Sequence, residues 1–449
     1  MESLNFEHLV EKWAPVLNEE SAGSIGDRHR RNVTAAVLEN QERAMAAENS
    51  QAGFLAETAA NHTGVAANWD PVLISLVRRA MPNLMAYDVC GVQPMSGPTG
   101  LIFAMKSKYS GERKADGSAM QDHNGVTAGT EALHQEAETG YSGSDSNTVH
   151  AGGPSGLAGA ADPVDTNRVT NDFGGGMSTE DAEALGNTGN AFGEMGFTIE
   201  KATVTAKSRA LKAEYTIELA QDLKAIHGLD AEAELANILS AEILAEINRE
   251  VIRTINSQAK TGCLQSNTKI DGIFDLSSDA DGRWSVEKFK GLLVQLDREC
   301  NVIAKETRRG KGNVVICSSD VATALTASGM LDYSPALSTS LQVDDTGNTF
   351  AGVLNGRTRV YIDPYATADY INVGYKGTNP YDAGLFYCPY VPLTMVRAVG
   401  EDTFQPKIGF KTRYGMASNP FVGSSPASGL AADRSNQYYR IFRVDNILA

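Results

Sequence analysis

The feature that most constrains this fold is an acidic, glycine-rich stretch between residues 115 and 200. It contains 14 acidic residues and one basic residue, Arg168, and so holds most of the net charge of −16. Its glycines cluster at 152–159 and 174–176, and Ser, Thr, Asn and Asp fill the gaps. Such a composition buries little apolar surface, and a loop of about 90 residues inside one compact domain is uncommon. We therefore expect residues 106–200 to form an extended hairpin that carries a small inserted module.

The sequence on either side of this stretch is nearly neutral and has the patterns of packed structure. Apolar residues at helical spacing follow the potential N-cap Asp230 and predict one helix over 230–256. A helix of about 26 residues is roughly 40 Å long, which suits a structural strut. A helix from Ser285, a buried strand at 314–317 and a helix capped at 318–320 predict an α/β region over 271–400.

Residues 1–50 predict two polar helices, and a linker of small residues follows at 51–68. The first helix has one apolar face, which consists of Phe6, Leu9, Val10 and Trp13. Pro15 is expected to end this helix. A second helix is expected to begin after Asp27 and to run to about Glu48. Two helices on a linker form a separable N-terminal arm.

Charge and cysteine content exclude several classes of protein. An acidic chain repels nucleic acid, so it is not expected to coat DNA by neutralising phosphates. The five cysteines are odd in number and form no CxxC pair, which disfavours a disulfide framework or a zinc ribbon. The N-terminus lacks the apolar core of a signal peptide, and no run approaches 18 apolar residues. We expect a protein that folds in a reducing cytoplasm and has no membrane partner.

The sequence offers no motif of ordinary catalysis: there is no P-loop, GxGxxG, HExxH or GxSxG. Glu131, His134 and Glu138 have a spacing that could bind a divalent cation on a helix, but a solvated acidic surface is the favoured interpretation. A basic run that could contact phosphate consists of Lys305, Arg308, Arg309 and Lys311. A solvated loop or a subunit contact is favoured for this run. The cysteines are expected to be buried. We predict no catalytic, cofactor-binding or metal-binding residue, and no enzyme.

Three blocks of the sequence resemble a known family. They are NWDPVLISLVRRAMPNLMAYDVCGVQPMSGPTGLIFAMKSKYSG at 68–111, GNVVICSSDVATAL at 312–325 and YKGTNPYDAGLFYCPYVPLTMVRAV at 375–399. With the long helix, they closely resemble the major capsid (head shell) protein of T-even-type tailed myoviruses. The resemblance covers most of the chain outside the glycine-rich insert. The vertex (pentamer) protein of the same phages is a paralogue and the nearest alternative.

The resemblance implies an α+β, HK97-type capsid fold with an N-terminal arm, an extended loop, a peripheral domain with a long spine helix, and an axial domain. The sequence then divides into a propeptide at 1–57, the arm and the start of the peripheral domain at 58–105, the extended loop with an acidic insertion domain at 106–200, the peripheral domain with the spine helix at 201–270, the axial domain at 271–400, and C-terminal strands that return to these domains at 401–449.

The family is also made as a precursor, from which a prohead protease removes the propeptide by cutting after Glu. Leu55 and Glu57, followed by Thr58, match the small-or-aliphatic-x-Glu pattern of that protease. The pattern recurs at 17–19 and 244–246, but only 55–58 lies in the linker of small residues, where a protease finds an extended substrate. We predict cleavage after Glu57. The apolar face of the first helix is predicted to dock the precursor on an internal scaffold, and a role as a solubility tag is the alternative.

The function that the resemblance implies is self-assembly, mainly as hexamers, into the icosahedral or prolate head shell that encloses double-stranded DNA. Expected partners are other copies of the chain, the vertex protein, the internal scaffold and prohead protease, and the portal and outer decoration proteins. Packaged DNA is contacted only non-specifically. The chain is expected to assemble in the host cytoplasm and to reside in the virion. An encapsulin-like nanocompartment shell and a hydrolase are the other classes, and the propeptide and the missing nucleophile–base pair argue against them.

A basic group at the base of the extended loop is the candidate contact between subunits. It consists of Lys106, Lys108, Arg113 and Lys114. Because the loop is expected to lie on another subunit, we predict that this group meets an acidic neighbour across an interface. The acidic insertion is expected on the shell exterior or against basic surfaces of neighbouring subunits.

Overall fold

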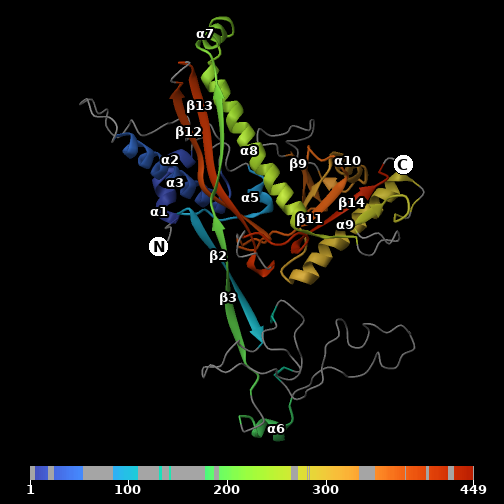
Figure 1. Cartoon of the computed structure of the whole chain (residues 1–449). Coiled ribbons are helices and arrows are strands. Elements are labelled where there is room, and N and C mark those ends of the chain that lie inside the picture. The colour runs from blue at the N-terminus through green and yellow to red at the C-terminus, as the bar shows by residue number, and fades with distance from the viewer. Residues whose placement is uncertain are drawn as a thin grey trace. The chain divides into compact units, whose positions relative to one another are not determined.

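The computed structural model describes residues 6–18, 25–53, 84–109, 131–133, 141–142, 177–186, 192–263, 272–280, 282, 284–332, 349–379, 381–400, 404–422 and 429–447 (Figure 1). The chain divides into two compact units. The first holds residues 1–102, 202–305 and 310–449, and the second holds residues 103–201 and 306–309. Both larger sheets belong to the first unit.

A four-stranded sheet of the first unit has the strand order β1-β12-β13-β4. Its strands are β1 (Gly91–Val92), β12 (Leu385–Val399), β13 (Pro406–Ser418) and β4 (Lys207–Glu214). β12 and β13 are antiparallel, β4 is antiparallel to β13, and β1 is parallel to β12. Val92 pairs with Tyr387, so this sheet joins segments that are far apart in the sequence.

An eight-stranded sheet has the order β5-β14-β11-β7-β10-β9-β8, with β6 also paired to β14. Its strands are β5 (Ala259–Thr261), β6 (Ile273–Asp275), β7 (Val314–Cys317), β8 (Leu331–Asp332), β9 (Thr349–Leu354), β10 (Thr358–Ile362), β11 (Tyr370–Gly374) and β14 (Asn436–Asp445). β7 is buried at every residue, as its apolar run predicts. β14 comes from the range 401–449, whereas β12, from the range 271–400, pairs in the smaller sheet.

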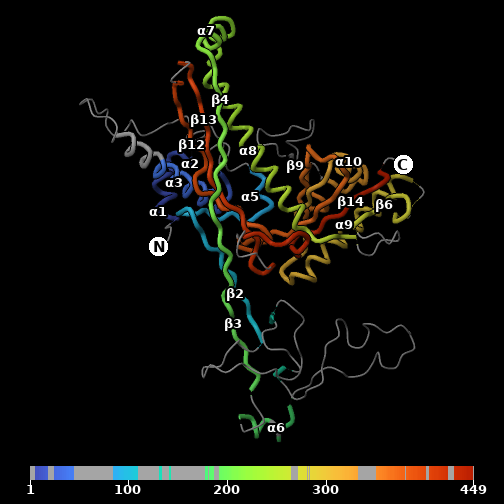
Figure 2. The backbone as a smooth tube through the Cα atoms, in the orientation of Figure 1, coloured from blue at the N-terminus to red at the C-terminus, as the bar shows by residue number. Residues whose placement is uncertain are grey.

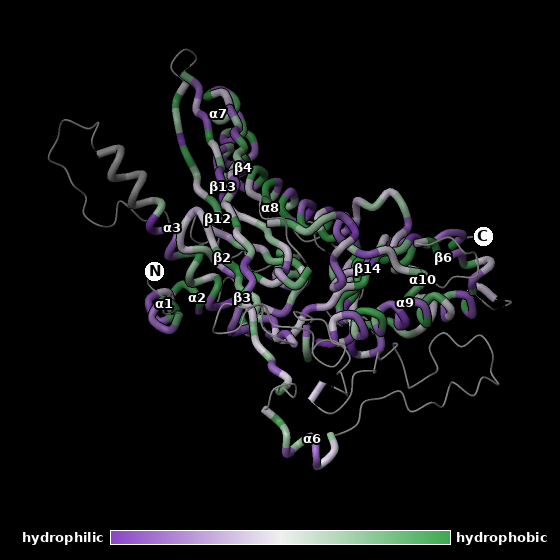
Figure 3. The backbone as a smooth tube through the Cα atoms, turned by 60° about the horizontal axis from the view of Figure 1, so that its bottom comes forward, coloured by the Kyte–Doolittle hydropathy of each residue, from purple (hydrophilic) through white to green (hydrophobic). Residues whose placement is uncertain are grey.

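Helices α9 (Ser285–Thr307) and α10 (Ser319–Ala327) share a buried apolar cluster with the larger sheet. Figure 3 shows the hydrophobic and hydrophilic residues that alternate along α9, as expected of a helix with one buried face. Ser318 stands at the N-cap of α10, as predicted, but its side chain does not cap the helix. Its hydroxyl instead donates to Asp369 Oδ1 at 2.8 Å, because β11 places Asp369 beside it.

The long helix α8 (Ala231–Gln258) confirms the prediction of a strut over 230–256. The carboxylate of Asp230 caps it by accepting a hydrogen bond from the Glu232 amide at 3.2 Å. Ile243, Ile247 and Val251 recur every fourth residue and are fully buried. α8 contacts β4 and β13 of one sheet and β14 of the other, so a single helix joins both sheets.

A buried ion pair lies in the core of the larger sheet. Arg440 on β14 donates its Nε hydrogen to Glu299 Oε2 on α9 at 2.7 Å, and both side chains are about 5% exposed or less. Glu299 also accepts hydrogen bonds from the Cys263 amide and from Gln295 Nε2, each at 2.8 Å. The buried carboxylate is thus satisfied on both oxygens, which a charge out of water requires.

The N-terminal helices are α1 (Phe6–Lys12), α2 (Ala14–Leu17) and α3 (Arg28–Gly53). Lys12 bridges α1 to α3 through Glu39 at 2.7 Å and Glu42 at 2.5 Å. α3 in turn packs on β12. In the intact chain, the apolar residues of the described part of 1–57 join the main core instead of forming a core of their own.

Two boundaries in this region also differ from prediction. α1 ends at Lys12, and Pro15 stands in the first turn of α2, where a missing amide hydrogen costs nothing, so it does not end the first helix. α3 runs to Gly53, five residues beyond the expected end near Glu48. The remainder of the expected linker at 54–68 lies outside the described residues.

The second unit is built on a two-stranded ribbon of β2 (Thr99–Tyr109) and β3 (Met195–Thr205), whose ends 99–102 and 202–205 belong to the first unit. Figure 2 shows the two strands as adjacent tubes. β3 ends at Thr205 and β4 begins at Lys207, with a break at Ala206. Tyr109 and Tyr141 form a small cluster in which their ring centroids are 4.6 Å apart. The second unit also contains the short helix α6 (Thr179–Glu183). Most of the acidic insertion lies outside the described residues.

Candidate inter-subunit surfaces

The β2–β3 ribbon exposes a row of large apolar side chains. They are Phe103, Met105, Met195, Phe197 and Ile199, and each is 55% to 65% exposed. All have odd numbers, and side chains two residues apart share one face of a strand. Exposing this much contiguous apolar surface to water is unfavourable. Such patches mark sites that another protein covers. We call these five residues the apolar ribbon face.

The opposite, even-numbered face of the same ribbon is buried or paired within the chain, and Ala104, Ala202 and Val204 are buried on it. Lys106 on β2 lies 2.8 Å from Glu200 on β3. Because this pair occupies even-numbered positions, the two strands present the odd-numbered apolar residues together on the other side. Lys106 therefore has an acidic partner in its own ribbon, whereas the predicted partner was a residue of a neighbouring subunit. Lys108 forms a β-bridge with Glu131, and Arg113 and Lys114 lie outside the described residues.

A second group of exposed apolar residues lies on α7 (Ile217–Ile226) in the first unit. Thr216 caps this helix by accepting a hydrogen bond from the Leu219 amide, yet no residue of α7 is buried. Its exposed apolar side chains are Ile217, Leu219 and Ile226. α7 contacts α8, and Leu223 is half-buried, but three of its apolar side chains remain at least half exposed. Such a helix is suited to a contact with another molecule.

The end of the four-stranded sheet near α7 is braced by ion pairs. Glu214 of β4 lies 3.0 Å from Lys407 of β13, and Arg397 of β12 lies 2.5 Å from Glu232 in the first turn of α8. Figure 1 shows α7 beside the ends of these strands. Exposed ion pairs contribute little stability. The first pair joins β4 to β13, and the second joins β12 to α8.

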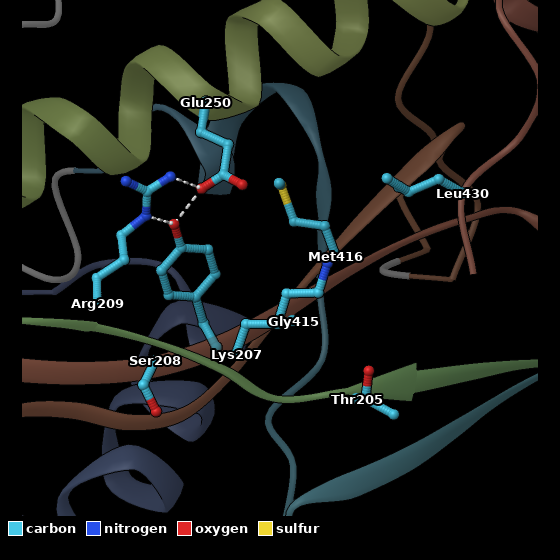
Figure 4. Close-up of a pocket in the computed structure, with 9 residues that line it drawn as sticks. Thr205, Lys207, Ser208, Arg209, Glu250, Gly415, Met416 and Leu430 are labelled. Carbon is cyan, nitrogen blue, oxygen red and sulfur yellow. Dashed lines mark hydrogen bonds and ion pairs between the residues drawn. The ribbon is translucent and has the colours of Figure 1, made fainter. Parts of the chain in front are cut away.

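A pocket of about 320 Å³ between β4, β13 and α8 contains a hydrogen-bonded network (Figure 4). Arg209 donates to Tyr414 Oη at 2.6 Å, to Glu246 at 3.0 Å and to Glu250 at 2.5 Å, and Tyr414 also donates to Glu250. Burial, followed by the hydrogen bond to Glu250, raises the pKa of Tyr414 well above its usual value, so the phenol stays protonated. The network contains no nucleophile and joins the strut to the sheet.

Other kinds of chemistry find little support in the described part of the chain. All five cysteines are free and buried, as predicted, and burial raises the pKa of each thiol to about 12, which makes them poor nucleophiles. Among the described residues, no group of His, Cys, Asp and Glu could hold a metal ion. Of the proposed trio only Glu131 is described. No helix in the described ranges is both long and apolar enough to cross a membrane.

The structure places the predicted scaffold-docking face against the chain itself. Leu9 and Trp13 are buried, and Phe6 and Val10 are half-buried against the same core cluster. This face is occupied by α3 and is not free for another protein, because α1 and α3 bury their apolar sides together. The predicted cleavage residues Leu55, Glu57 and Thr58 lie outside the described residues.

Two features of the structure escaped the interpretation of the sequence. The apolar ribbon face has a readable signal, because Phe103 and Met105 alternate with polar or small residues, as do Met195, Phe197 and Ile199. The period of two predicts an exposed or buried face equally well, so only the structure separates the two. The packing of α3 on the main core has no comparable signal.

Comparison with known proteins gives consistent matches. The family model described as "Major capsid protein Gp23" matches residues 66–444. The major capsid protein of Salmonella phage ViI is 45% identical over 97% of this chain and 97% of its own length, and that of Enterobacteria phage T4 is 38% identical over 94% and 93%. The capsid vertex protein of phage T4 is 30% identical over 50% of this chain and 53% of its own length.

Solved structures also match. One titled "Mycobacterium phage Bobi" has a TM-score of 0.36 at 9% identity, and the match covers 88% of this chain and 98% of that chain. The capsid of an empty GTA particle has a TM-score of 0.34 at 13% identity, with coverage of 88% and 98%. The helices and sheets of this chain confirm the predicted α+β class, and its long helix, ribbon and two sheets are the parts expected of an HK97-type capsid fold.

Proposed function

Since this chain belongs to the Gp23 family of major capsid proteins of tailed myovirus heads, we propose that it assembles, mainly as hexamers, into a shell around double-stranded DNA. The family match over nearly the whole chain carries this proposal. The apolar ribbon face supports it, because a folded subunit that exposes five large apolar side chains in a row needs neighbours to cover them. The role is structural, without catalysis.

The vertex protein is the less favoured alternative. Major capsid proteins match this chain over more than nine-tenths of its length, whereas the vertex protein of phage T4 matches half of it. A nanocompartment shell is likewise not favoured by the family match. We propose the vertex protein as a partner in the same shell. Internal scaffold, prohead protease, portal and decoration proteins are further proposed partners, and DNA is contacted without sequence preference because the chain is acidic.

Electron microscopy of the expressed full chain tests the function. We expect closed shells, tubes or hexameric assemblies, because family members of this kind bury their apolar surfaces against one another. Counting copies per particle in whole virions separates the major shell protein, which is abundant, from a vertex protein. A protein that stays monomeric at every concentration and salt condition, also when co-expressed with its phage assembly factors, contradicts the proposal.

We also propose that a prohead protease cuts the precursor after Glu57 in the host cytoplasm. N-terminal sequencing of mature virion protein is expected to start at Thr58, and Glu57→Ala is expected to leave full-length chain in the particles. Glu19→Ala, which changes the other matching site near the N-terminus, is the control and should be processed normally. Finding Met1 in mature wild-type particles rules out this cleavage.

The acidic insertion and the remaining basic residues are further proposed contacts. The insertion carries nearly all the excess negative charge, so we propose that it lies on the outside of the shell or against basic surfaces of neighbours. Arg113 and Lys114 are the members of the basic group proposed to reach an acidic neighbour, since Lys106 already pairs with Glu200. Charged contacts at the edge of an interface determine the orientation of the two subunits more than the affinity between them.

A further inference from the structure

Trp284 lies directly before α9 and is an exposed aromatic side chain. It is 73% exposed, whereas a tryptophan of a folded chain usually buries most of its large apolar surface. Its backbone is held in place, because the amides of Glu287 and Lys288 donate to the Trp284 carbonyl at 3.0 Å and 3.2 Å. The chain therefore presents an uncovered indole ring on an ordered backbone at the start of α9.

Arg308 lies at the other end of the same helix. It directly follows Thr307, the last residue of α9, and its backbone φ is 54°. Helices commonly end on a residue in this left-handed region, and that residue is usually glycine because a Cβ is strained there. The Arg308 side chain is exposed, as is that of Lys305. Lys311, from the same basic run, instead pairs with Asp297 of its own chain.

Both ends of α9 thus carry residues that helix ends disfavour. Trp284 stands at the N-cap, where Ser, Thr, Asp and Asn are preferred. The Trp284 amide donates to Glu287 Oε2 at 3.4 Å, which is one half of a capping box, and the missing half is a hydroxyl at position 284. Local stability favours serine at 284 and glycine at 308. Residues that break such local rules mark sites with another role.

The two side chains are complementary but cannot meet within one chain. α9 has 23 residues and is roughly 35 Å long, and Trp284 and Arg308 lie at its opposite ends. The face of an indole ring carries negative electrostatic potential and is the best aromatic partner for a guanidinium. Trp and Arg are also enriched among the residues that dominate protein interfaces. A ring of identical subunits needs two different surfaces on each copy, since one contact repeats head to tail.

We propose that the indole face of Trp284 in one copy packs on the Arg308 guanidinium of the next copy, in a contact that repeats around the ring. The proposal rests on the proposed shell function and names one pair of residues through which neighbouring subunits of a hexamer meet. The exposed Lys305, in the last turn of α9, places a second positive charge beside Arg308. A phosphate of packaged DNA is the competing partner for these charges, but it leaves Trp284 without a role.

Trp284→Ser and Arg308→Gly test the contact, because each change is expected to favour the folded subunit and to weaken assembly. Serine completes the capping box, and glycine relieves the left-handed residue, so the midpoint of thermal unfolding should stay at or above that of wild type. The protein concentration for half-maximal assembly, measured by sedimentation, is expected to rise about tenfold or more in each variant, because one cation–π contact is lost.

The double variant Trp284→Ser/Arg308→Gly shows whether the two residues act together. It is expected to need about the same concentration as the more affected single variant, because both changes remove the same contact. Arg434→Gly is the matched control. Arg434 is also an exposed arginine in the left-handed region, with φ 57°, but it lies in the loop before β14. This control should assemble like wild type.

Cross-linking with a bismaleimide tests the head-to-tail direction, since all five native cysteines are buried. Assembled Trp284→Cys/Arg308→Cys is expected to give a ladder of linked chains. An equal mixture of the two single variants should stop at linked dimers, and either single variant alone should give none. Links in Trp284→Cys alone would show that this residue meets its own copy and would overturn the proposed pair.

The remaining outcomes separate the contact from the proposed shell function. If wild type assembles and the serine and glycine variants assemble equally well, the contact is wrong and the shell function stands. Additive losses in the double variant also overturn the pairing of these two residues. Normal assembly of Arg308→Gly with less retained DNA assigns Arg308 to phosphate. If wild type forms no rings or shells under any condition, the shell function fails and the contact fails with it.

Discussion

Phe103→Ser with Phe197→Ser is expected to abolish particle formation and to leave the subunit folded. Both rings are about two-thirds exposed on the apolar ribbon face, so they contribute little to the stability of the isolated chain. Burying one Phe against a neighbour is worth about 3 kcal/mol, so the double variant loses roughly 6 kcal/mol at each contact. Because each roughly 1.4 kcal/mol is a factor of ten in affinity, contacts weaken by about four orders of magnitude.

Sedimentation and electron microscopy of the purified variant measure this loss, and circular dichroism confirms the retained fold. Val294→Ser is the matched control. Val294 is an apolar residue of α9 that is 60% exposed, nearly as much as Phe197, but it lies outside the ribbon. This control is expected to assemble like wild type. Shells of the double variant at wild-type yield would show that the ribbon face is not an inter-subunit contact.

Glu299→Ala is expected to lower the free energy of unfolding by about 3–5 kcal/mol. The change leaves the Arg440 guanidinium buried without its carboxylate, and it also removes the acceptor of the Cys263 amide. The cost of an uncompensated buried charge exceeds the value of an ordinary ion pair. Denaturant unfolding, measured in the non-assembling Phe103/Phe197 background so that association does not contribute, gives the number.

Asp297→Ala on the same helix provides the comparison. Asp297 pairs with Lys311, and both side chains are at least one-third exposed, so its loss is expected to cost less than about 1 kcal/mol. The two variants remove one carboxylate each from α9 and differ mainly in burial. Equal losses of stability for the two variants would contradict the assignment of a buried, stabilising pair to Glu299 and Arg440.

Local patterns predicted the parts of this fold that depend on neighbours in sequence. The spacing of Ile243, Ile247 and Val251 fixes the buried face of α8, and Asp230 fixes its start. The β7 run from Val314 to Cys317 is apolar throughout and is buried throughout. The family resemblance, carried by long blocks, supplied the architecture and the function class, which patterns of this kind do not determine.

Contacts between distant segments could not be predicted in the same way. The pairing of Val92 with Tyr387 and the packing of α3 on β12 depend on which surfaces meet after folding, and a single sequence carries no local signal for that choice. Lys106 shows the same limit. Its charge led to the prediction of an acidic partner on a neighbouring subunit, but the pairing of β2 with β3 places Glu200 of the same chain beside it.

The burial of all five thiols has a consequence for a particle that leaves its host. A phage head forms in reducing cytoplasm and then persists in air-saturated water, where accessible thiols oxidise and cross-link. Cys90, Cys263, Cys300, Cys317 and Cys388 are buried, and their raised pKa keeps them as thiols. In the shell proposed for this chain, these thiols are therefore not expected to oxidise or cross-link when the redox surroundings change.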